Sequence, residues 1–301
     1  MFSLRLSKMQ RIEYLTVLFF LKLSRILPVS FVYGMFDFFA FLSFHILKKR
    51  RVLTISNLTL AYPDKSKKEI YLIAKNCFKS VAKTAAEIFL LFTDRKRLED
   101  FILNKNEVSA KLRKITDGNK NGIIFMTAHF GNWEILSHFV ALCGYPLIVI
   151  GRKGDNKYIE DNLTKHFRER YGSKNIYKKE AMSKMIKTLK SSGNIGILID
   201  QKVGRTNSAK GTFFGIECYS TTSVANMKLK YDPLVIPIFA KREQNGQYTI
   251  MFESTASYKA EDKTDKDEKI ISLTQYYNDI IEHAVREAPE QWFWMHNRWK
   301  V

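Results

Sequence analysis

Residues 122–134 read Gly122-Ile123-Ile124-Phe125-Met126-Thr127-Ala128-His129-Phe130-Gly131-Asn132-Trp133-Glu134. The apolar run that ends at Thr127 predicts a buried strand, and the segment that begins at Trp133 predicts a helix. Gly131 permits a tight turn between the two, and Asn132 is a suitable N-cap residue for the helix. The stretch therefore predicts a strand–turn–helix unit, with His129 at the carboxyl end of its strand.

Polar residues also follow three other apolar runs: residues 146–150 before Arg152, residues 195–199 before Asp200 and Gln201, and residues 234–239 before Lys241-Arg242. Strand and helix signals alternate from residue 121 onward, so we predict an α/β fold with a mixed, mostly parallel sheet and flanking helices. Ligands of open α/β sheets bind outside the carboxyl ends of the strands. A base, an acid and cations at one sheet edge favour an enzyme with an anionic substrate.

Local sequence signals predict secondary structure in parts of the remaining chain. Residues 156–171 are predicted to form one crossover helix, and Ser66 is a plausible cap of a helix that follows it. The glycine-, serine- and threonine-rich residues 204–219 are predicted to be a loop. Asn245-Gly246 is a strong hairpin signal, and residues 261–268 are predicted to be a charged surface loop.

Composition limits the class of protein. The chain has 301 residues, of which 46% are hydrophobic, and this excludes a disordered or multi-span protein. Its formal net charge of +19 attracts nucleic acid, anionic lipid or an acidic protein. Three widely spaced cysteines without a metal-ligand pattern favour a reducing, cytosol-facing location.

The N-terminal region selects among these partners. Residues 12–47 are dense in apolar side chains, but Pro28, Gly34 and Asp37 interrupt the run, so we predict two amphipathic helices joined near Pro28. Nine basic residues against two acidic ones in residues 1–51 suit an anionic membrane interface on the cytoplasmic side. The alternative is a helical hairpin packed on the sheet. We divide the chain into membrane-associating helices over residues 1–51 and an α/β domain over residues 52–301.

His129 and Glu134 are the first candidates for catalysis. Glu134 is expected in the first turn of the helix, from which its carboxylate could reach back to His129. A carboxylate bonded to one ring nitrogen fixes the tautomer and raises the basicity of the other nitrogen. The alternative is a chance spacing of the two residues. No third metal ligand and no G-x-S-x-G nucleophile elbow accompany them, so we predict no metal and no serine nucleophile.

Ordered blocks of sequence carry a family resemblance. The block Thr127-Ala128-His129-Phe130-Gly131-Asn132-Trp133-Glu134 resembles the His-x-x-x-x-Asp/Glu block of the lipid A late acyltransferases (lauroyl/myristoyl type), within the lysophospholipid acyltransferase superfamily. Four more blocks are similar to this family in the same order: Arg51 through Asn57-Leu58 to Tyr62-Pro63; Arg168-x-Arg170-x-Gly172; Asp200-Gln201 through Phe213-Phe214-Gly215 to Thr221-Thr222; and Pro289-Glu290-Gln291-Trp292 through His296-x-Arg298-Trp299-Lys300.

The resemblance implies an acyltransferase on the cytoplasmic face of the inner membrane. It would move an acyl group from acyl carrier protein to a hydroxyl of a lipid A precursor in lipopolysaccharide biosynthesis, without a cofactor or an acyl-enzyme. His129 would be the general base and Glu134 its orienting acid. The expected partners are the carrier protein, the lipid A precursor and the membrane surface, with no nucleic acid.

The resemblance also implies substrate-binding residues: Arg152, Arg168, Arg170, Asp200, Gln201 and Asn132. Planar guanidinium groups suit bidentate phosphate contact. The alternatives are a solvated helix face for Arg168 and Arg170, and a structural strand-end acid for Asp200. Phe213-Phe214-Gly215 would line an acyl channel or belong to an aromatic core. The alternative function is an acyl-CoA-dependent acyltransferase for another membrane glycolipid.

Overall fold

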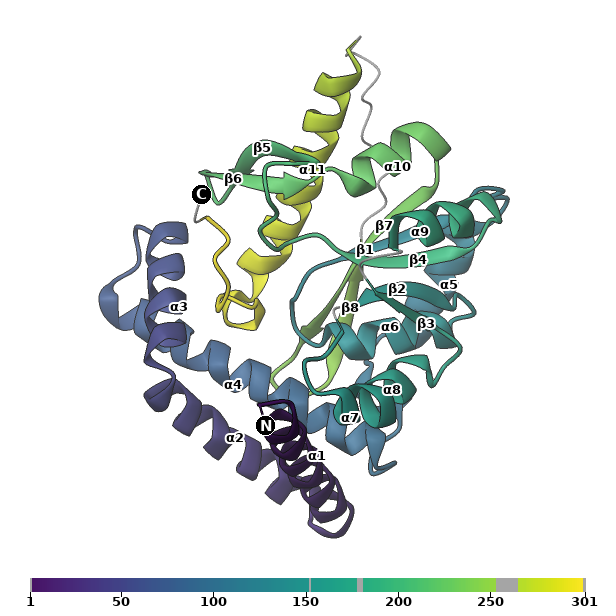
Figure 1. Ribbon diagram of the computed structural model, residues 1–301. Coiled ribbons are helices and arrows are strands. Elements are labelled where there is room, and N and C mark those ends of the chain that lie inside the picture. The colour runs from purple at the N-terminus through teal and green to yellow at the C-terminus, as the bar shows by residue number, and fades with distance from the viewer. Residues whose placement is uncertain (1, 152, 178–180, 253–264, 300–301) are drawn as a thin grey trace.

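The computed structural model describes residues 2–151, 153–177, 181–252 and 265–299. Its centre is a six-stranded sheet with the order β3-β2-β4-β1-β7-β8, in which all neighbouring strands are parallel except β7 and β8 (Figure 1). The strands are β1 (Ile123–Thr127), β2 (Leu147–Gly151), β3 (Lys174–Tyr177), β4 (Asn194–Leu198), β7 (Leu234–Arg242) and β8 (Tyr248–Phe252). The predicted mixed, mostly parallel sheet is confirmed.

Two helical layers cover the sheet. On one face, Ile123 and Phe125 of β1 pack with α5 (Lys105–Thr116) and α6 (Trp133–Leu142). On the other face, Ile124 and Met126 pack with α9 (Ala181–Lys190), α10 (Ser223–Tyr231) and α11 (Lys266–Glu287). Alternate side chains of a strand point to opposite faces, so the continuous apolar run of β1 reflects burial on both sides.

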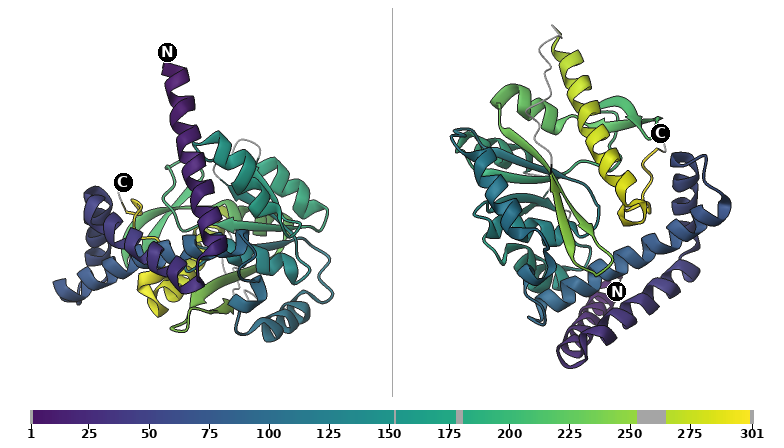
Figure 2. Two further views of the ribbon diagram at one scale, coloured as in Figure 1. Left: turned by 90° about the horizontal axis from the view of Figure 1, so that it is seen from below. Right: turned by 180° about the vertical axis from the view of Figure 1, so that it is seen from behind.

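The first four helices of the described chain are α1 (Phe2–Ile26), α2 (Val29–Ile46), α3 (Lys48–Ala61) and α4 (Lys67–Phe92). The break between α1 and α2 lies at Pro28, as predicted. Ser66 caps α4 in a capping box with Glu69, an arrangement that contributes about 1 kcal/mol in typical helices. The left view of Figure 2 shows α1 projecting from the body, and the right view shows α4 along one end of the sheet. The predicted domain boundary after residue 51 falls inside α3, and the division stays a prediction.

One N-terminal helix has the character of a membrane segment. By length and composition α2 could cross a membrane, with a mean hydropathy of 1.5 and 22% of its residues buried. Val32 and Phe36 of α2 pack against Ala86 and Leu90 of α4. Several large apolar side chains elsewhere on α1 and α2 are more than 45% exposed, among them Leu15, Phe19, Phe31, Phe38 and Phe41.

One predicted loop is a β-hairpin in the structure. The predicted loop over residues 204–219 contains a hairpin of β5 (Ser208–Phe213) and β6 (Ile216–Thr221). Its turn places Phe214 and Gly215 at φ +56° and +72°, and a phenylalanine is rare in this left-handed region. The predicted crossover helix over residues 156–171 is present as three consecutive helical segments: α7 (Lys157–Ile159), a π-helical segment (Glu160–Thr164) and α8 (Lys165–Glu169).

One of the other local assignments agrees with the structure. β7 and β8 pair in an antiparallel hairpin around Asn245-Gly246, as predicted. Residues 261–264, half of the predicted charged loop, lie outside the described residues. Residues 266–268 belong to α11, with Asp265 as its N-cap, so the loop prediction was wrong there.

Candidate active site

A tight turn between β1 and α6 presents His129. Gly131 in this turn has φ +56°, and a Cβ atom placed there would lie 1.7 Å from the carbonyl oxygen of Ala240. Only glycine fits this approach, because any side chain would collide with the backbone of β7. Asn132 caps α6 by accepting the N–H of Ile135 at 3.1 Å, which confirms its predicted capping role.

The side chain that orients His129 is Asp200, just beyond the neighbouring strand β4. His129 Nδ1 lies 2.9 Å from Asp200 Oδ1, and the His129 backbone N–H donates to Asp200 Oδ2 at 3.0 Å. Trp292 Nε1 donates to the same Oδ2 at 2.8 Å. Asp200 is 1% exposed, whereas the His129 side chain is 25% exposed. A buried carboxylate thus fixes one ring nitrogen, while part of the imidazole faces solvent.

The two groups shift each other's proton affinity. Burial lowers the pKa of the His129 imidazole, but the charge of Asp200 and its hydrogen bond outweigh burial, so that this pKa lies above its ordinary value. Burial raises the pKa of the Asp200 carboxyl, but His129 reverses the effect and holds that pKa below its ordinary value. Asp200 is therefore ionised across the physiological range, and it stabilises an imidazolium.

Glu134 has a different partner from the one expected. Its carboxylate accepts two hydrogen bonds from Arg168, from Nε at 3.1 Å and from Nη2 at 2.6 Å. Burial raises the pKa of Glu134, but Arg168 outweighs burial and lowers it. The described residues show no hydrogen bond between Glu134 and His129. The expectation that Glu134 orients the imidazole is therefore corrected: Asp200 holds that place, because the end of β4 lies beside the end of β1.

Comparisons with known proteins identify the family of the chain. The family model described as "Bacterial lipid A biosynthesis acyltransferase" matches residues 1–301. The chain belongs to this family. Acyl transfer in lipid A synthesis is the activity of the family, and the predicted membership is confirmed.

Curated relatives are distant but cover most of the chain. A lipid A biosynthesis lauroyltransferase of Escherichia coli (strain K12) is 25% identical over 282 residues, which cover 91% of this chain and 87% of the relative. A lipid A biosynthesis palmitoleoyltransferase of the same organism is 24% identical over 259 residues, which cover 85% and 80%. A lipid A biosynthesis acyltransferase of Shigella flexneri shows the same values.

The other predicted site residues of this acyltransferase lie at different distances from His129. Gln201 is exposed, and its Nε2 lies 3.4 Å from His129 Nε2. Asn132 is fully buried, and its side chain bonds to Ile135 and Glu87, so the predicted substrate contact is corrected to a structural role. Arg170 donates to the carbonyl of Leu91 at 2.7 Å and pairs with Asp94.

Arg170 is thus tied to the end of α4 rather than placed beside His129, and its predicted substrate contact stays a prediction. Arg168 alone of this pair lies at the site, through Glu134. Arg152 lies outside the described residues, and its predicted phosphate contact stays a prediction.

An apolar cavity of about 210 Å³ opens beside the Glu134–Arg168 pair. It lies between α1, α4 and the π-helical segment with α8, and its lining includes Val17, Leu21, Phe89, Phe92 and Leu163. Such a cavity with charge at one side suits a hydrocarbon chain that carries a polar end. The aromatic pair Phe213 and Phe214 does not line it. These rings pack with tryptophans of the segment after α11, which settles their role as core.

Sequence reasoning did not identify the segment over residues 291–293 as part of the site. Trp292 binds Asp200, the Phe293 N–H donates to the His129 carbonyl at 3.0 Å, and the Gly131 N–H donates to the Gln291 carbonyl at 3.0 Å. The matching block around Trp292 was the only signal, and it did not say where the block folds. Among the described residues, no serine, threonine or cysteine side chain is bonded to His129.

Proposed function

We propose that this acyltransferase moves a fatty acyl group from acyl carrier protein to a hydroxyl of a lipid A precursor, with His129 as general base. The observation that carries the proposal is the His129–Asp200 pair at the ends of β1 and β4. Asp200 occupies Nδ1, so Nε2 is left to accept a proton.

The proposed reaction is a direct transfer. His129 Nε2 takes the proton of the acceptor hydroxyl, and the oxygen attacks the thioester carbonyl. The tetrahedral intermediate collapses, the carbon–sulfur bond breaks, and the imidazolium returns its proton to the leaving thiolate. A general base of this kind contributes roughly 10²–10⁴ to a rate. Gln201 lies on the exposed side of the imidazole, where its amide would meet the acceptor.

Charge and apolar surface support the proposed partners. Glu134 uses Nε and Nη2 of Arg168, which leaves Nη1 of that guanidinium without a hydrogen-bond partner among the described residues. We assign it to an anionic group of a substrate. The cavity beside it would hold an acyl chain, and the net charge of +19 would attract both an acidic carrier protein and lipid phosphates.

The N-terminal helices would bind the cytoplasmic face of the inner membrane. The exposed apolar residues of α1 and α2 and the basic residues near them support this placement. Flotation of the purified protein with anionic lipid vesicles tests it, and protein left at the bottom of the gradient would contradict it.

The decisive assay uses purified protein, a tetra-acylated lipid A precursor, and thioesters of acyl carrier protein and of CoA in graded chain lengths. Mass spectrometry should find one added acyl group with the carrier thioesters. His129→Ala should lower this rate by about 10²–10⁴. If product formed only with CoA thioesters, the acyl donor would be acyl-CoA rather than the acyl carrier protein thioester. No product from any thioester would overturn the acceptor or donor class.

The pH dependence of kcat/KM should follow the free imidazole. Because Asp200 raises the pKa of His129, the base is protonated and inactive below that pKa and active above it. We expect a single rising limb, with its midpoint above the ordinary histidine value of about 6.5. Rates measured from pH 5 to pH 9 with saturating donor test this. A midpoint below 6.5 would contradict the pairing with Asp200.

A further inference from the structure

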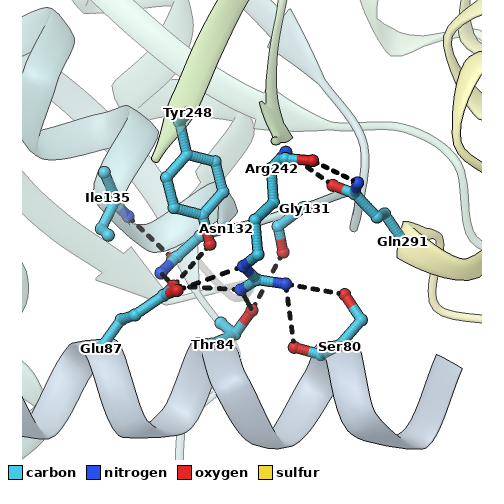
Figure 3. A network of polar contacts seen from close by, with 9 residues as sticks. All are labelled: Ser80, Thr84, Glu87, Gly131, Asn132, Ile135, Arg242, Tyr248 and Gln291. Carbon is cyan, nitrogen blue, oxygen red and sulfur yellow. Dashed lines mark hydrogen bonds and ion pairs between the residues drawn. The ribbon is translucent and has the colours of Figure 1, made fainter. Parts of the chain in front are cut away.

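A buried polar network adjoins the turn between β1 and α6 (Figure 3). At its centre the carboxylate of Glu87, from α4, faces Arg242 from β7 and Tyr248 from β8. Glu87 is 1% exposed, Arg242 9% and Tyr248 0%. None of these residues belongs to the His129–Asp200 pair or to the Glu134–Arg168 pair.

Every N–H of the Arg242 guanidinium has a partner. Nε and Nη2 donate to the two oxygens of Glu87 at 3.1 and 3.0 Å. Nη1 donates to the hydroxyl and the carbonyl of Ser80, and Nη2 also donates to Thr84 Oγ1 at 3.1 Å. Burial of an ion pair is costly, and apolar residues often replace one without loss of stability. Its presence here is therefore better explained by the geometry that it imposes than by stability.

The carboxylate reaches the catalytic turn through one side chain. Asn132 Nδ2 donates to Glu87 Oε2 at 2.8 Å, while Asn132 Oδ1 caps α6 through the N–H of Ile135. Tyr248 donates its hydroxyl to the same Oε2. The position after Gly131 thus needs a donor toward α4 and an acceptor toward α6, and an asparagine amide supplies both.

The backbone of the turn is held at two more points. Thr84, which accepts from Arg242, donates to the Gly131 carbonyl at 3.1 Å. The Gly131 N–H donates to the Gln291 carbonyl. The Gln291 side chain in turn accepts the Arg242 N–H at 2.7 Å and donates to the Arg242 carbonyl at 2.8 Å. The network therefore restrains both the peptide groups of the turn and the strand beside it.

We propose that Glu87 and Arg242 are positioning residues that fix the turn between β1 and α6 and thereby hold the His129 imidazole against Asp200. The kinetic part of this inference rests on the proposed acyl transfer. Its structural part, the placement of His129, does not.

The test exchanges the charges of two contacting residues. Glu87→Gln leaves Arg242 buried without a counter-ion. It also places the new amide at position 87 against the amide of Asn132, where the parent has a carboxylate acceptor. Adding Asn132→Asp returns one carboxylate to the same contact and keeps the cap of α6, since aspartate is a good N-cap residue. The amide introduced at position 87 can then donate a hydrogen bond to the carboxylate introduced at position 132. In the parent protein the direction is the reverse, since Glu87 accepts from Asn132.

We expect Glu87→Gln to lower kcat by about 100-fold with little change in KM, since a misplacement of about 1 Å can cost that much. The double variant Glu87→Gln/Asn132→Asp should recover at least about tenfold of the loss, because the network again holds the turn in place. Tyr248→Phe removes a single hydroxyl from the network and should lower kcat several-fold. It serves as the test if Glu87→Gln does not fold.

The matched control is Asn278→Asp, the same change at a buried asparagine of α11 that bonds to Ser220. The new carboxylate would lie near Arg298, whose Nη2 is 3.5 Å from Asn278 Oδ1, so the charge of a buried contact changes here too. The variant should leave kcat per folded molecule unchanged. A double variant no faster than Glu87→Gln, or a Tyr248→Phe variant with the kcat of the parent, would overturn the proposal.

A second readout does not need activity. In protein labelled with ¹⁵N-histidine, the His129 imidazole should titrate at a lower pH in Glu87→Gln, because it loses its fixed contact with Asp200. The double variant should restore the titration. If His129 titrated in Glu87→Gln at the same pH as in the parent protein, the positioning role would be contradicted. If the parent protein were inactive but His129 still titrated at a raised pH and responded to Glu87→Gln, only the proposed reaction would be contradicted.

Discussion

Replacing Asp200 by asparagine should lower kcat by about 10⁴-fold in a protein that still folds, the size of effect found when the acid of a hydrolase triad is neutralised. The reason lies in the hydrogen bonds of Asp200 Oδ2, which accepts both the His129 backbone N–H and the Trp292 Nε1–H. The amide oxygen of an asparagine would settle at that position to keep both bonds. Its NH₂ group would then face His129 Nδ1.

This orientation forces the wrong tautomer. Nδ1 would have to accept a hydrogen bond, so the ring proton would move to Nε2, the nitrogen that we propose as the base. Initial rates of acyl transfer at saturating substrates measure the effect, and circular dichroism confirms the fold. Trp292→Phe is the control, since it removes one donor and leaves the Asp200 carboxylate in place. It should lower kcat by at most about 100-fold, because one hydrogen bond to a charged group contributes about 1.5–3 kcal/mol.

A larger effect of Glu134→Gln than of Asp200→Asn would change which carboxylate is assigned to orient His129. If Asp200→Asn kept a tenth of the parental kcat while Glu134→Gln abolished turnover, the orienting carboxylate would be Glu134, as the sequence motif suggests.

Replacing Arg168 by methionine should destabilise the protein more than most single substitutions. It leaves the Glu134 carboxylate without its two hydrogen bonds in a largely buried place. Removing one partner of a buried ion pair costs about 3–5 kcal/mol. The side chains of Arg168 and Glu134 keep exposures of 23% and 14%, so the low end of that range applies. Denaturant unfolding followed by fluorescence measures the free energy of unfolding.

A double variant separates stability from chemistry. Glu134→Gln/Arg168→Met removes both charges and should recover most of the lost stability, because no buried charge is left unpaired. It should stay impaired in acyl transfer, since the proposed anion contact of Arg168 is gone. The solvent-exposed pair of Lys210 and Glu217 is the control, and Lys210→Met should leave the free energy of unfolding nearly unchanged, because exposed ion pairs contribute little to stability. A double variant as unstable as Arg168→Met would show that the packing of the arginine stem matters more than its charge.

The sheet was predictable because its strands are continuous apolar runs. The observed β1, β2, β4 and β7 lie where residues 122–127, 146–150, 195–199 and 234–239 predicted them. Burial on both faces removes the need for alternation, so short apolar runs between turns are a strong signal. The β5–β6 hairpin was missed because its turn uses Phe214 in a conformation that phenylalanine seldom adopts. No rule on turn residues could have found it.

Only the part of the site that depends on neighbouring residues in the sequence was predictable. His129 and the turn glycine stand in one strand–turn–helix unit, so their roles follow from adjacent residues. The choice between Asp200 and Glu134 depends on which strand lies beside β1, and strand order is not a local property. The same limit applies to Glu87, which is 45 residues away from Asn132 along the chain and in contact with it through space.

The attachment of residues 291–293 to the catalytic turn has a consequence for synthesis of the protein. These residues are translated more than 150 positions after His129, yet they hold the His129 carbonyl, the Gly131 N–H and the Asp200 carboxylate. A nascent chain that already contains the whole sheet still lacks an assembled site. Acyl transfer should therefore begin only once this late segment has left the ribosome and bound to the catalytic turn. Partially translated chains at a membrane should be inactive.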